Sequence, residues 1–228
     1  MPSTVALAER IISCDACPRL VEWRERVARD KRASYMDEEY WGRPIPGFGD
    51  PAAHVLIVGL APAAHGANRT GRMFTGDRSG DWLFRAMHRA GLATQPTSAH
   101  RGDGLDLHGA YVTAATHCAP PANKPTPDEL ATCRPWLFRE LELLAPTVRV
   151  AVCLGGIGYQ TLWNVLAARS DELPRPRPPF GHGIEVPLVS GLTIVCSYHP
   201  SQQNTFTGRL TESMLDMVFE RANEIAGA

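Results

Sequence analysis

The stretch His54-Val-Leu-Ile-Val-Gly-Leu60 decides the fold class of this 228-residue chain. The run is short and apolar on both faces, which is typical of a strand buried inside a parallel sheet. Runs of the same kind cover residues 110–115 and 149–154, and a helical pattern follows each of the three. Strands that alternate with helices in this way predict an α/β fold in which a parallel sheet lies between layers of helices.

Capping and turn residues mark where further elements begin and end. Ser79 is expected to cap the helix after the first strand, and Gly91 to end it. Thr126-Pro-Asp-Glu129 is a capping box with proline at the first helical position, so a second helix is expected to begin there. The runs 184–189 and 192–197 are β-like and are joined by a Ser-Gly pair, which predicts a hairpin.

Composition is that of an ordinary globular chain. Hydrophobic residues make up 44% and charged residues 21%, and the length suits one domain spanning residues 1–228. No apolar run approaches the roughly 18 residues that a membrane span needs. The N-terminus shows no basic segment followed by an apolar one, so we expect a cytoplasmic protein without a secretory signal.

The charge pattern indicates little about partners. A net charge of −1 does not by itself indicate a nucleic-acid partner. Residues 69–89 nevertheless carry a basic cluster, which consists of Arg69, Arg72, Arg78, Arg85 and Arg89 against Asp77 and Asp81. Such a cluster could bind a phosphate backbone, although on charge alone a solvated helix face explains it better.

Six cysteines in a cytosolic chain favour a metal or cluster site over disulfides, since that compartment keeps thiols reduced. Cys14 and Cys17 form a CxxC pair between two helices expected within residues 1–35, and Cys118 and Cys133 lie on either side of the capping box. Four such thiolates can hold one tetrahedral metal ion or an iron–sulfur cluster, and their spacing does not separate zinc from iron. The alternative is that they are buried cysteines that pack as small apolar residues.

Ligands bind at the carboxyl ends of the strands in sheets of this type. The loops of interest are therefore those that follow Gly59, Ala115, Leu154 and Ser197. The loops after Gly59, Ala115 and Ser197 are rich in glycine, proline or polar residues.

The first and the last of these loops carry the chemistry. In residues 59–80, Phe74 offers an aromatic face amid glycines and Asp77 offers a carboxylate. A phosphate-cradling loop, or a long connection whose aromatic ring packs into the core, would explain the same residues. After the last strand, the imidazole of His199 can hydrogen-bond a ligand oxygen. The ordinary alternative is a histidine that only bonds to the backbone.

Four segments together resemble the uracil-DNA glycosylase superfamily, and most closely its fifth family, the B-type enzymes of bacteria and archaea. The segments are Gly59-Leu-Ala-Pro62, Gly71-Arg-Met-Phe-Thr-Gly-Asp77, Cys118-Ala-Pro-Pro-Ala-Asn-Lys-Pro-Thr-Pro127 and His199-Pro-Ser-Gln-Gln-Asn-Thr-Phe-Thr-Gly-Arg-Leu-Thr211. With the cysteines they span nearly the whole chain in the order of the family. The resemblance implies a three-layer α/β/α fold with a central four-stranded, mainly parallel sheet, and a monomer. It also implies a [4Fe-4S] cluster on Cys14, Cys17, Cys118 and Cys133.

The resemblance further implies an enzyme that excises uracil from DNA after flipping the base out of the duplex. Phe74 matches the aromatic residue that stacks on the base, His199 the residue that stabilises the departing base, and Asn123 an asparagine that assists. Asp77 is a candidate for orienting water or stabilising the sugar cation. The base pocket would also include Gly59, Ala61, Ala64 and Ala114. The DNA would be bound by Arg69, Arg72, Ser201, Gln202, Gln203, Asn204 and Arg209.

Two polar groups of many relatives are missing here. Where relatives carry Asp, Asn or Glu after the first-motif glycine, this chain has Leu60-Ala61, and Ala114 replaces an asparagine that reads uracil strictly. Both absences fit the B-type branch and its broader range of bases, which includes hypoxanthine, xanthine, hydroxymethyluracil and ethenocytosine. A pocket without a hydrogen-bonding discriminator rejects wrong bases poorly.

Two alternatives remain open at this point. One is a non-catalytic or DNA-crosslinking relative that flips a base and holds it. The other is a zinc-stabilised nucleotide-binding protein that uses the loop 71–80, and a brown preparation would exclude zinc. A DNA substrate would place the protein at the nucleoid.

Overall fold

Four buried strands form the parallel centre of the sheet, as the apolar runs predict. In the computed structural model, which describes residues 3–227, they are β2 (Val55–Gly59), β3 (Ala110–Ala114), β4 (Val150–Leu154) and β6 (Thr193–Ser197). Their order across the sheet is β3-β2-β4-β6, and all three pairings are parallel. Nearly every residue of these strands is buried.

Two short antiparallel strands extend the sheet to six, which corrects the expected number of four. β1 (Phe48–Gly49) pairs with β3 at one edge. β5 (Glu185–Pro187) pairs with β6 at the other edge and confirms the predicted hairpin. β1 was not predicted because two residues are too short to show an alternating pattern.

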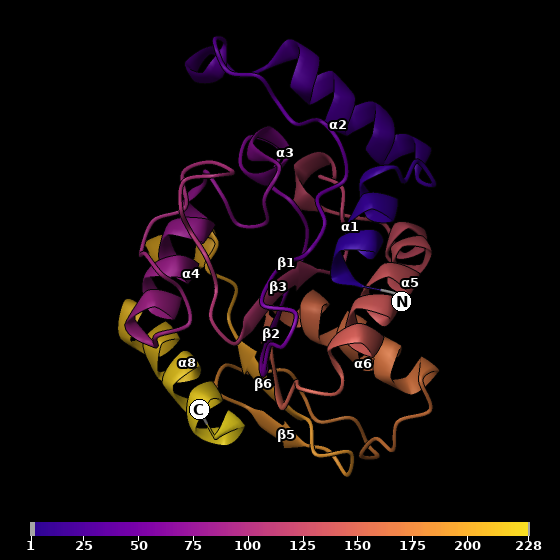
Figure 1. Cartoon of the computed structure of the whole chain (residues 1–228), viewed down its shortest axis with the longest axis vertical. Coiled ribbons are helices and arrows are strands. Elements are labelled where there is room, and N and C mark those ends of the chain that lie inside the picture. The colour runs from indigo at the N-terminus through magenta and orange to yellow at the C-terminus, as the bar shows by residue number, and fades with distance from the viewer. Residues whose placement is uncertain (1–2, 228) are drawn as a thin grey trace.

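Helices cover both faces of the sheet, which confirms the three-layer α/β/α class (Figure 1). They are α4 (Arg78–Arg89) and α8 (Glu212–Ala226) on one face, and α5 (Pro127–Leu144) and α6 (Gly156–Ala168) on the other. Ile57 and Val152 point to the first face, whereas Leu56 and Ala151 point to the second. Successive side chains of a strand alternate between the faces, so each strand contributes to both cores.

Two N-terminal helices flank the CxxC pair, as predicted. They are α1 (Thr4–Ile12) and α2 (Pro18–Asp30), and α1 packs beside α5. The short helices of the loops are η1 (Ala33–Tyr35), α3 (Ala67–Thr70), η2 (Pro121–Asn123) and α7 (Gln202–Phe206).

The predicted capping box begins helix α5. The side chain of Thr126 accepts a hydrogen bond from the backbone of Glu129, and the side chain of Glu129 accepts one from the backbone of Thr126.

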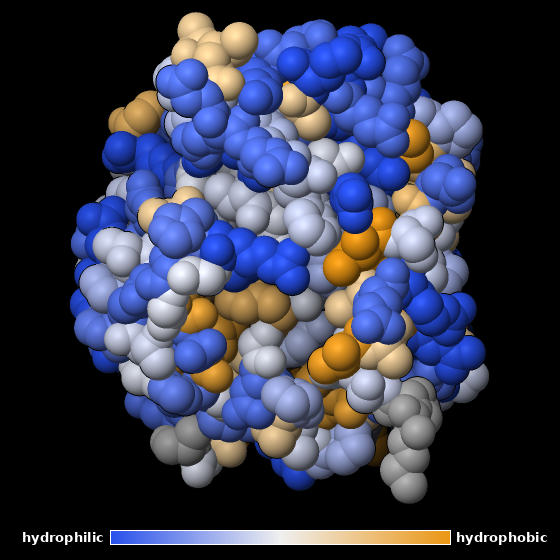
Figure 2. Space-filling model, turned by 45° about the horizontal axis from the view of Figure 1, so that its top comes forward, coloured by the Kyte–Doolittle hydropathy of each residue, from blue (hydrophilic) through white to orange (hydrophobic). Residues whose placement is uncertain are grey.

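On the surface that Figure 2 shows, hydrophilic residues predominate and apolar ones gather near a central hollow. Among residues 3–227, no helix combines the length and the apolar character that crossing a membrane requires.

Candidate active site

The strand register brings the ends of the four central strands to one edge of the sheet. Gly59 of β2 pairs with Ala114 of β3, and Leu154 of β4 pairs with Ser197 of β6. The four predicted loops therefore leave the sheet side by side, at the edge where ligands bind in parallel sheets.

Phe74 lies at the end of β2, where two glycines make room for it: Gly59 for its ring and Gly80 for its backbone. The backbone of Phe74 has a φ of 52°, a left-handed conformation that is uncommon for a bulky residue. Gly80 lies directly against the Phe74 carbonyl oxygen, where there is no room for a β-carbon. A β-carbon at Gly59 would lie 2.6 Å from the Cζ atom of Phe74. The ring thus occupies space that only glycine leaves free at the end of this strand.

His199 is neutral and is held by the first turn of α7. Its carbonyl oxygen accepts a hydrogen bond of 2.8 Å from the side-chain amide of Asn204. Burial lowers the pKa of His199 to about 4. At neutral pH the imidazole is therefore uncharged and has one N–H to donate to a ligand.

The rings of Phe74 and His199 lie next to each other. Their centroids are 5.9 Å apart and their planes differ by 30°. Gly155 faces this pair from the loop after β4, because a β-carbon there would lie 3.3 Å from the Cβ atom of His199. The structure therefore brings the first, third and fourth predicted loops together around one aromatic pair.

His182 supports the end of β6 and was missed in the sequence. Its Nδ1 accepts a hydrogen bond of 3.2 Å from the backbone N–H of Tyr198, and the two rings pack with centroids 5.2 Å apart. Burial lowers the pKa of His182, which favours the neutral form that this acceptor role needs. Only its flanking glycines distinguish His182 in the sequence, so the fold alone shows that it holds the residue before His199.

Asp77 caps helix α4, which corrects the expectation that Ser79 does so. Its Oδ1 accepts hydrogen bonds from the backbone N–H groups of Ser79 at 2.9 Å and Gly80 at 3.1 Å. The second oxygen, Oδ2, lies against Gly66. Burial raises the pKa of Asp77, although the two cap hydrogen bonds act in the opposite direction. The cap explains why a carboxylate stands here, and its part in catalysis stays a prediction.

Arg69 and Arg72 are buried, contrary to the expectation that they bind DNA. The side chain of Arg69 is 8% exposed and forms an ion pair with Glu38. The side chain of Arg72 is also 8% exposed, and it donates to Asp103 at 2.9 Å. Because each guanidinium already has a carboxylate partner, both residues stabilise the long loop after β2 and do not present their charge to a phosphate backbone.

The other expected pocket residues differ in exposure. Ala114 is buried at the end of β3, whereas Ala61 and Ala64 are partly exposed in the loop after β2. Asn123 is exposed at the end of η2, where its backbone has a φ of 54°. An exposed amide can bond to a ligand, but the role of each of these residues stays a prediction.

The segment after His199 presents polar and aromatic side chains to solvent. Residues 202–203 are exposed on α7, Ser201 before them is partly buried, and Phe206 is 66% exposed. The guanidinium of Arg78 lies 4.4 Å from the centre of the Phe206 ring, and that of Arg209 lies 4.5 Å from the centre of a neighbouring tyrosine ring. Aromatic faces beside cations suit contacts with bases and phosphates.

The four predicted ligand cysteines line one cavity between the N-terminal helices and α5. They are Cys14, Cys17, Cys118 and Cys133. In the described part of the chain, no group of three or more His, Cys, Asp or Glu side chains is arranged to hold a single metal ion. Four cysteine thiols around one cavity can hold one tetrahedral metal ion or an iron–sulfur cluster. Burial raises the pKa of the Cys118 thiol to about 11, although the charge and hydrogen bond of Arg24 act in the opposite direction. Binding of a metal or cluster would deprotonate such a thiol. The donor set fits a [4Fe-4S] cluster.

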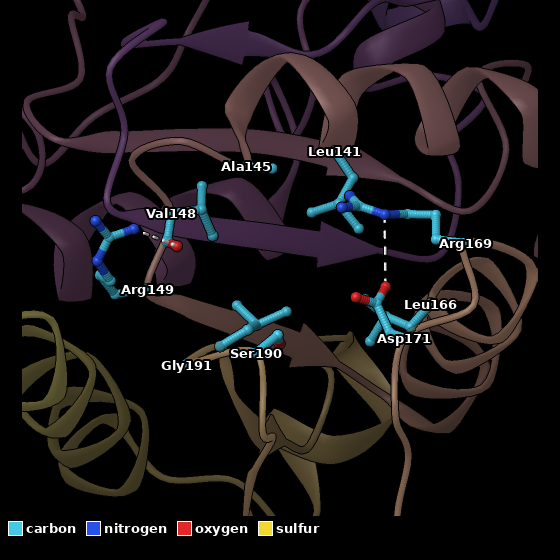
Figure 3. A pocket seen from close by; sticks show the side chains of 10 residues that line it. Leu141, Ala145, Val148, Arg149, Leu166, Arg169, Asp171, Ser190 and Gly191 are labelled. Carbon is cyan, nitrogen blue, oxygen red and sulfur yellow. Dashed lines mark hydrogen bonds and ion pairs between the residues drawn. The ribbon is translucent and has the colours of Figure 1, made fainter.

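A separate pocket lies at the opposite edge of the sheet (Figure 3). Residues that precede β4 and β6 line it, among them Arg149 and Leu192. Arg169 and Asp171 form an ion pair of 3.5 Å in its wall. Because the amino ends of the strands face away from their carboxyl ends, this pocket is not part of the candidate site.

A comparison with family models decides the membership of the chain. Residues 46–223 match the family described as the uracil DNA glycosylase superfamily. The chain belongs to this superfamily. The match covers both rings of the candidate site and two of the four cysteines. It confirms the expected family and the expected class of enzyme, a DNA glycosylase.

Individual members of the superfamily are similar to the chain over nearly its whole length. It is 53% identical to the type-5 uracil-DNA glycosylase of Mycobacterium bovis, covering 94% of this chain and 78% of the relative. It is 52% identical to the type-5 enzyme of Mycobacterium leprae, covering 97% and 95%. It is 50% identical to that of Thermus thermophilus, covering 97% and 98%. These similarities agree with the fifth, B-type family that the motifs resemble.

Proposed function

We propose that this protein hydrolyses the bond between uracil and deoxyribose in DNA and leaves an abasic site. The observation that carries the proposal is the pair of rings at the carboxyl edge of the sheet, with Phe74 and a neutral His199 5.9 Å apart. The type-5 relatives, which are named uracil-DNA glycosylases, support the same activity.

The chemistry of the bond explains why these residues suit it. Cleavage builds positive charge on the sugar and negative charge on the departing base, so fixed donors at the base oxygen favour the transition state. The N–H of His199 supplies one such donor, and the exposed amide of Asn123 supplies a second. Phe74 stacks on the flipped base and holds its oxygen toward these donors.

The range of bases is broader than uracil in this proposal. Ala114 is buried where the β3 strand ends, and Leu60-Ala61 follow Gly59 at the neighbouring strand end. None of these side chains can form a hydrogen bond that distinguishes one base from another. Hypoxanthine, xanthine, hydroxymethyluracil and ethenocytosine in DNA are therefore further substrates, with smaller differences in rate than a polar pocket would give.

The exposed segment of α7 contacts the DNA in this proposal. Phe206 enters the gap that the flipped base leaves in the stack, and the guanidinium of Arg78 beside it lies near the phosphates. Replacing Phe206 with Ala should slow excision from duplex DNA more than from single-stranded DNA, since only the duplex has a gap to fill. Binding should weaken steeply with salt.

The [4Fe-4S] cluster belongs to the same proposal. Cys14 and Cys17 near the N-terminus, together with Cys118 and Cys133, would hold it. The cluster supplies a crosslink between distant parts of the chain when bound, and a long closure of this kind gains most in entropy. Purified protein should contain iron and sulfide and absorb in the visible blue. Stoichiometric zinc in place of iron would overturn this part of the proposal.

Single-turnover excision from a uracil-containing duplex tests the activity. His199→Ala should lower the rate by about 10²–10³, the effect of losing one transition-state donor. His88→Ala removes an exposed histidine from α4 and serves as the matched control with an unchanged rate. A rate for His199→Ala within about threefold of wild type removes His199 from this role.

The products of the wild-type reaction separate the alternatives. Free uracil with more than one turnover supports a glycosylase. A covalent adduct between protein and DNA would instead indicate a crosslinking relative. Well-folded, iron-containing protein that leaves uracil attached to DNA would overturn the proposed function.

A further inference from the structure

Arg24 is a buried cation in the wall of the four-cysteine cavity. Its relative exposure is 5%. Its Nη1 donates hydrogen bonds to the Sγ atom of Cys118 at 2.9 Å and to the carbonyl oxygen of Cys14 at 3.2 Å. On α2 it lies between Leu20 and Val27 along the buried face, a position where helical spacing predicts an apolar residue.

The carboxylate closest in sequence does not neutralise Arg24 well. Glu25 lies 3.9 Å from the guanidinium, and its side chain is 60% exposed to water. The Nε atom of Arg24 has no hydrogen-bond partner among residues 3–227. A buried charge without a close partner of opposite charge is costly. An anion bound in the cavity would supply that partner for Arg24.

We propose that Arg24 is a positioning residue for the iron–sulfur cluster, where it offsets negative charge and fixes the sulfur of Cys118. This inference rests on the proposed cluster. Four thiolates outweigh the positive charge of a [4Fe-4S] core, so the group that fills the cavity is a net anion. Charge and hydrogen bonds at the cluster sulfurs set its reduction potential.

Two properties of the cluster should depend on Arg24. A nearby cation favours the more negative, reduced state, so loss of the charge lowers the reduction potential. A hydrogen bond that orients a ligand sulfur also slows the loss of iron. Charge and hydrogen-bond geometry can be separated, because lysine keeps the first and changes the second.

The experiment compares Arg24→Met, Arg24→Gln and Arg24→Lys in the full-length, cluster-loaded protein. Each is measured for iron and sulfide content, for the decay of visible absorbance in excess chelator, and for reduction potential by voltammetry. Arg26→Met is the matched control, since Arg26 is on the same helix but pairs with Glu22 at the surface. Asn68 donates to the backbone carbonyl of Arg24 at 3.1 Å, a bond that does not involve the substituted side chain. Circular dichroism checks that each variant is folded.

The expected result is an iron loss at least about tenfold faster in the Met and Gln variants, because a hydrogen bond to a charged group is removed. Their reduction potentials should fall, while Arg24→Lys keeps a potential near wild type but loses iron faster. Equal potentials and equal iron loss in Arg24→Met, Arg24→Gln and Arg26→Met would overturn the proposal. Absence of iron and visible absorbance from the wild-type protein would instead overturn the cluster itself, and the role of Arg24 with it.

Discussion

The side-chain amide of Asn204 donates a hydrogen bond of 2.8 Å to the carbonyl oxygen of His199. The backbone carbonyl of Asn204 in turn accepts a bond of 3.0 Å from the N–H of Leu210. Asn204 therefore connects the turn that carries the imidazole to the chain that leaves α7. The sequence suggested Asn204 as a DNA contact, and the structure shows its amide engaged in holding the active-site loop.

Asn204→Ala should slow excision about tenfold, less than His199→Ala, because one neutral hydrogen bond that orients the donor is lost. Single-turnover kinetics measure the effect. Asn223→Ala is a close control, since Asn223 makes a similar amide bond of 2.7 Å to the carbonyl of Ala90, far from the rings. The control should lower thermal stability and leave the excision rate unchanged. Equal losses of rate in both variants would mean that Asn204 acts only on overall stability.

The stability of the protein should fall at acidic pH partly because of His199. Burial lowers its pKa from 6.5 to about 4. Between these values the unfolded chain binds a proton that the folded chain does not, so this contribution to stability is present above pH 6.5 and is lost as the pH falls toward 4. Melting temperatures of wild type and His199→Gln, taken from pH 7 to 4, should show the steeper decline for wild type. Parallel curves would contradict the lowered pKa of the imidazole.

Gly59→Ala should impair the enzyme through Phe74. The added methyl group would lie 2.6 Å from the Cζ atom of the ring, so the ring must move. Loss of one base–aromatic stacking contact costs about 1–3 kcal/mol, so excision should fall by at least about fivefold, as in Phe74→Ala. Gly156→Ala is a control with space for the methyl group, whose nearest neighbour is a Phe180 ring atom at 3.7 Å. Wild-type excision by Gly59→Ala would show that the position of the ring is unimportant.

The central fold could be predicted from local sequence because its signals are local. The run 54–60 is apolar on both faces. Such a run is stable mainly as a strand of a parallel sheet that helices cover on both sides. The capping box at Thr126 and the hairpin before β6 are also short-range patterns, and both are present. The two-residue β1 carries no such pattern, since its pairing with β3 depends on a partner more than sixty residues away.

The residues that carry the chemistry of the site could be predicted from their types and motifs, but their contacts could not. Phe74 and His199 are brought together as the motifs suggested, but the partners of charged residues depend on the tertiary fold. Arg72 belongs to a basic cluster in sequence, yet Asp103, thirty-one residues away, neutralises it. Arg24 offered one usable signal, a charge on the apolar face of a helix that follows the CxxC pair.

Asp77 has two possible roles that one pair of substitutions separates. Its Oδ1 caps α4 through two backbone N–H groups, and asparagine caps helices about as well as aspartate. Asp77→Asn should therefore keep the free energy of unfolding of wild type, while Asp77→Ala should lose about 1 kcal/mol. Chemical denaturation measures both differences.

Excision by the stable Asp77→Asn variant then reports on catalysis alone. If the carboxylate orients water or stabilises the sugar cation, the rate should fall by about 10²-fold or more, the usual contribution of such a group. Burial raises the pKa of Asp77 above 3.8, so the wild-type rate should decline as the pH drops through the raised value, whereas the Asn variant should lack this decline. A full rate for Asp77→Asn at every pH would show that Asp77 serves only as the helix cap. The attacking water would then need no charged group from this loop.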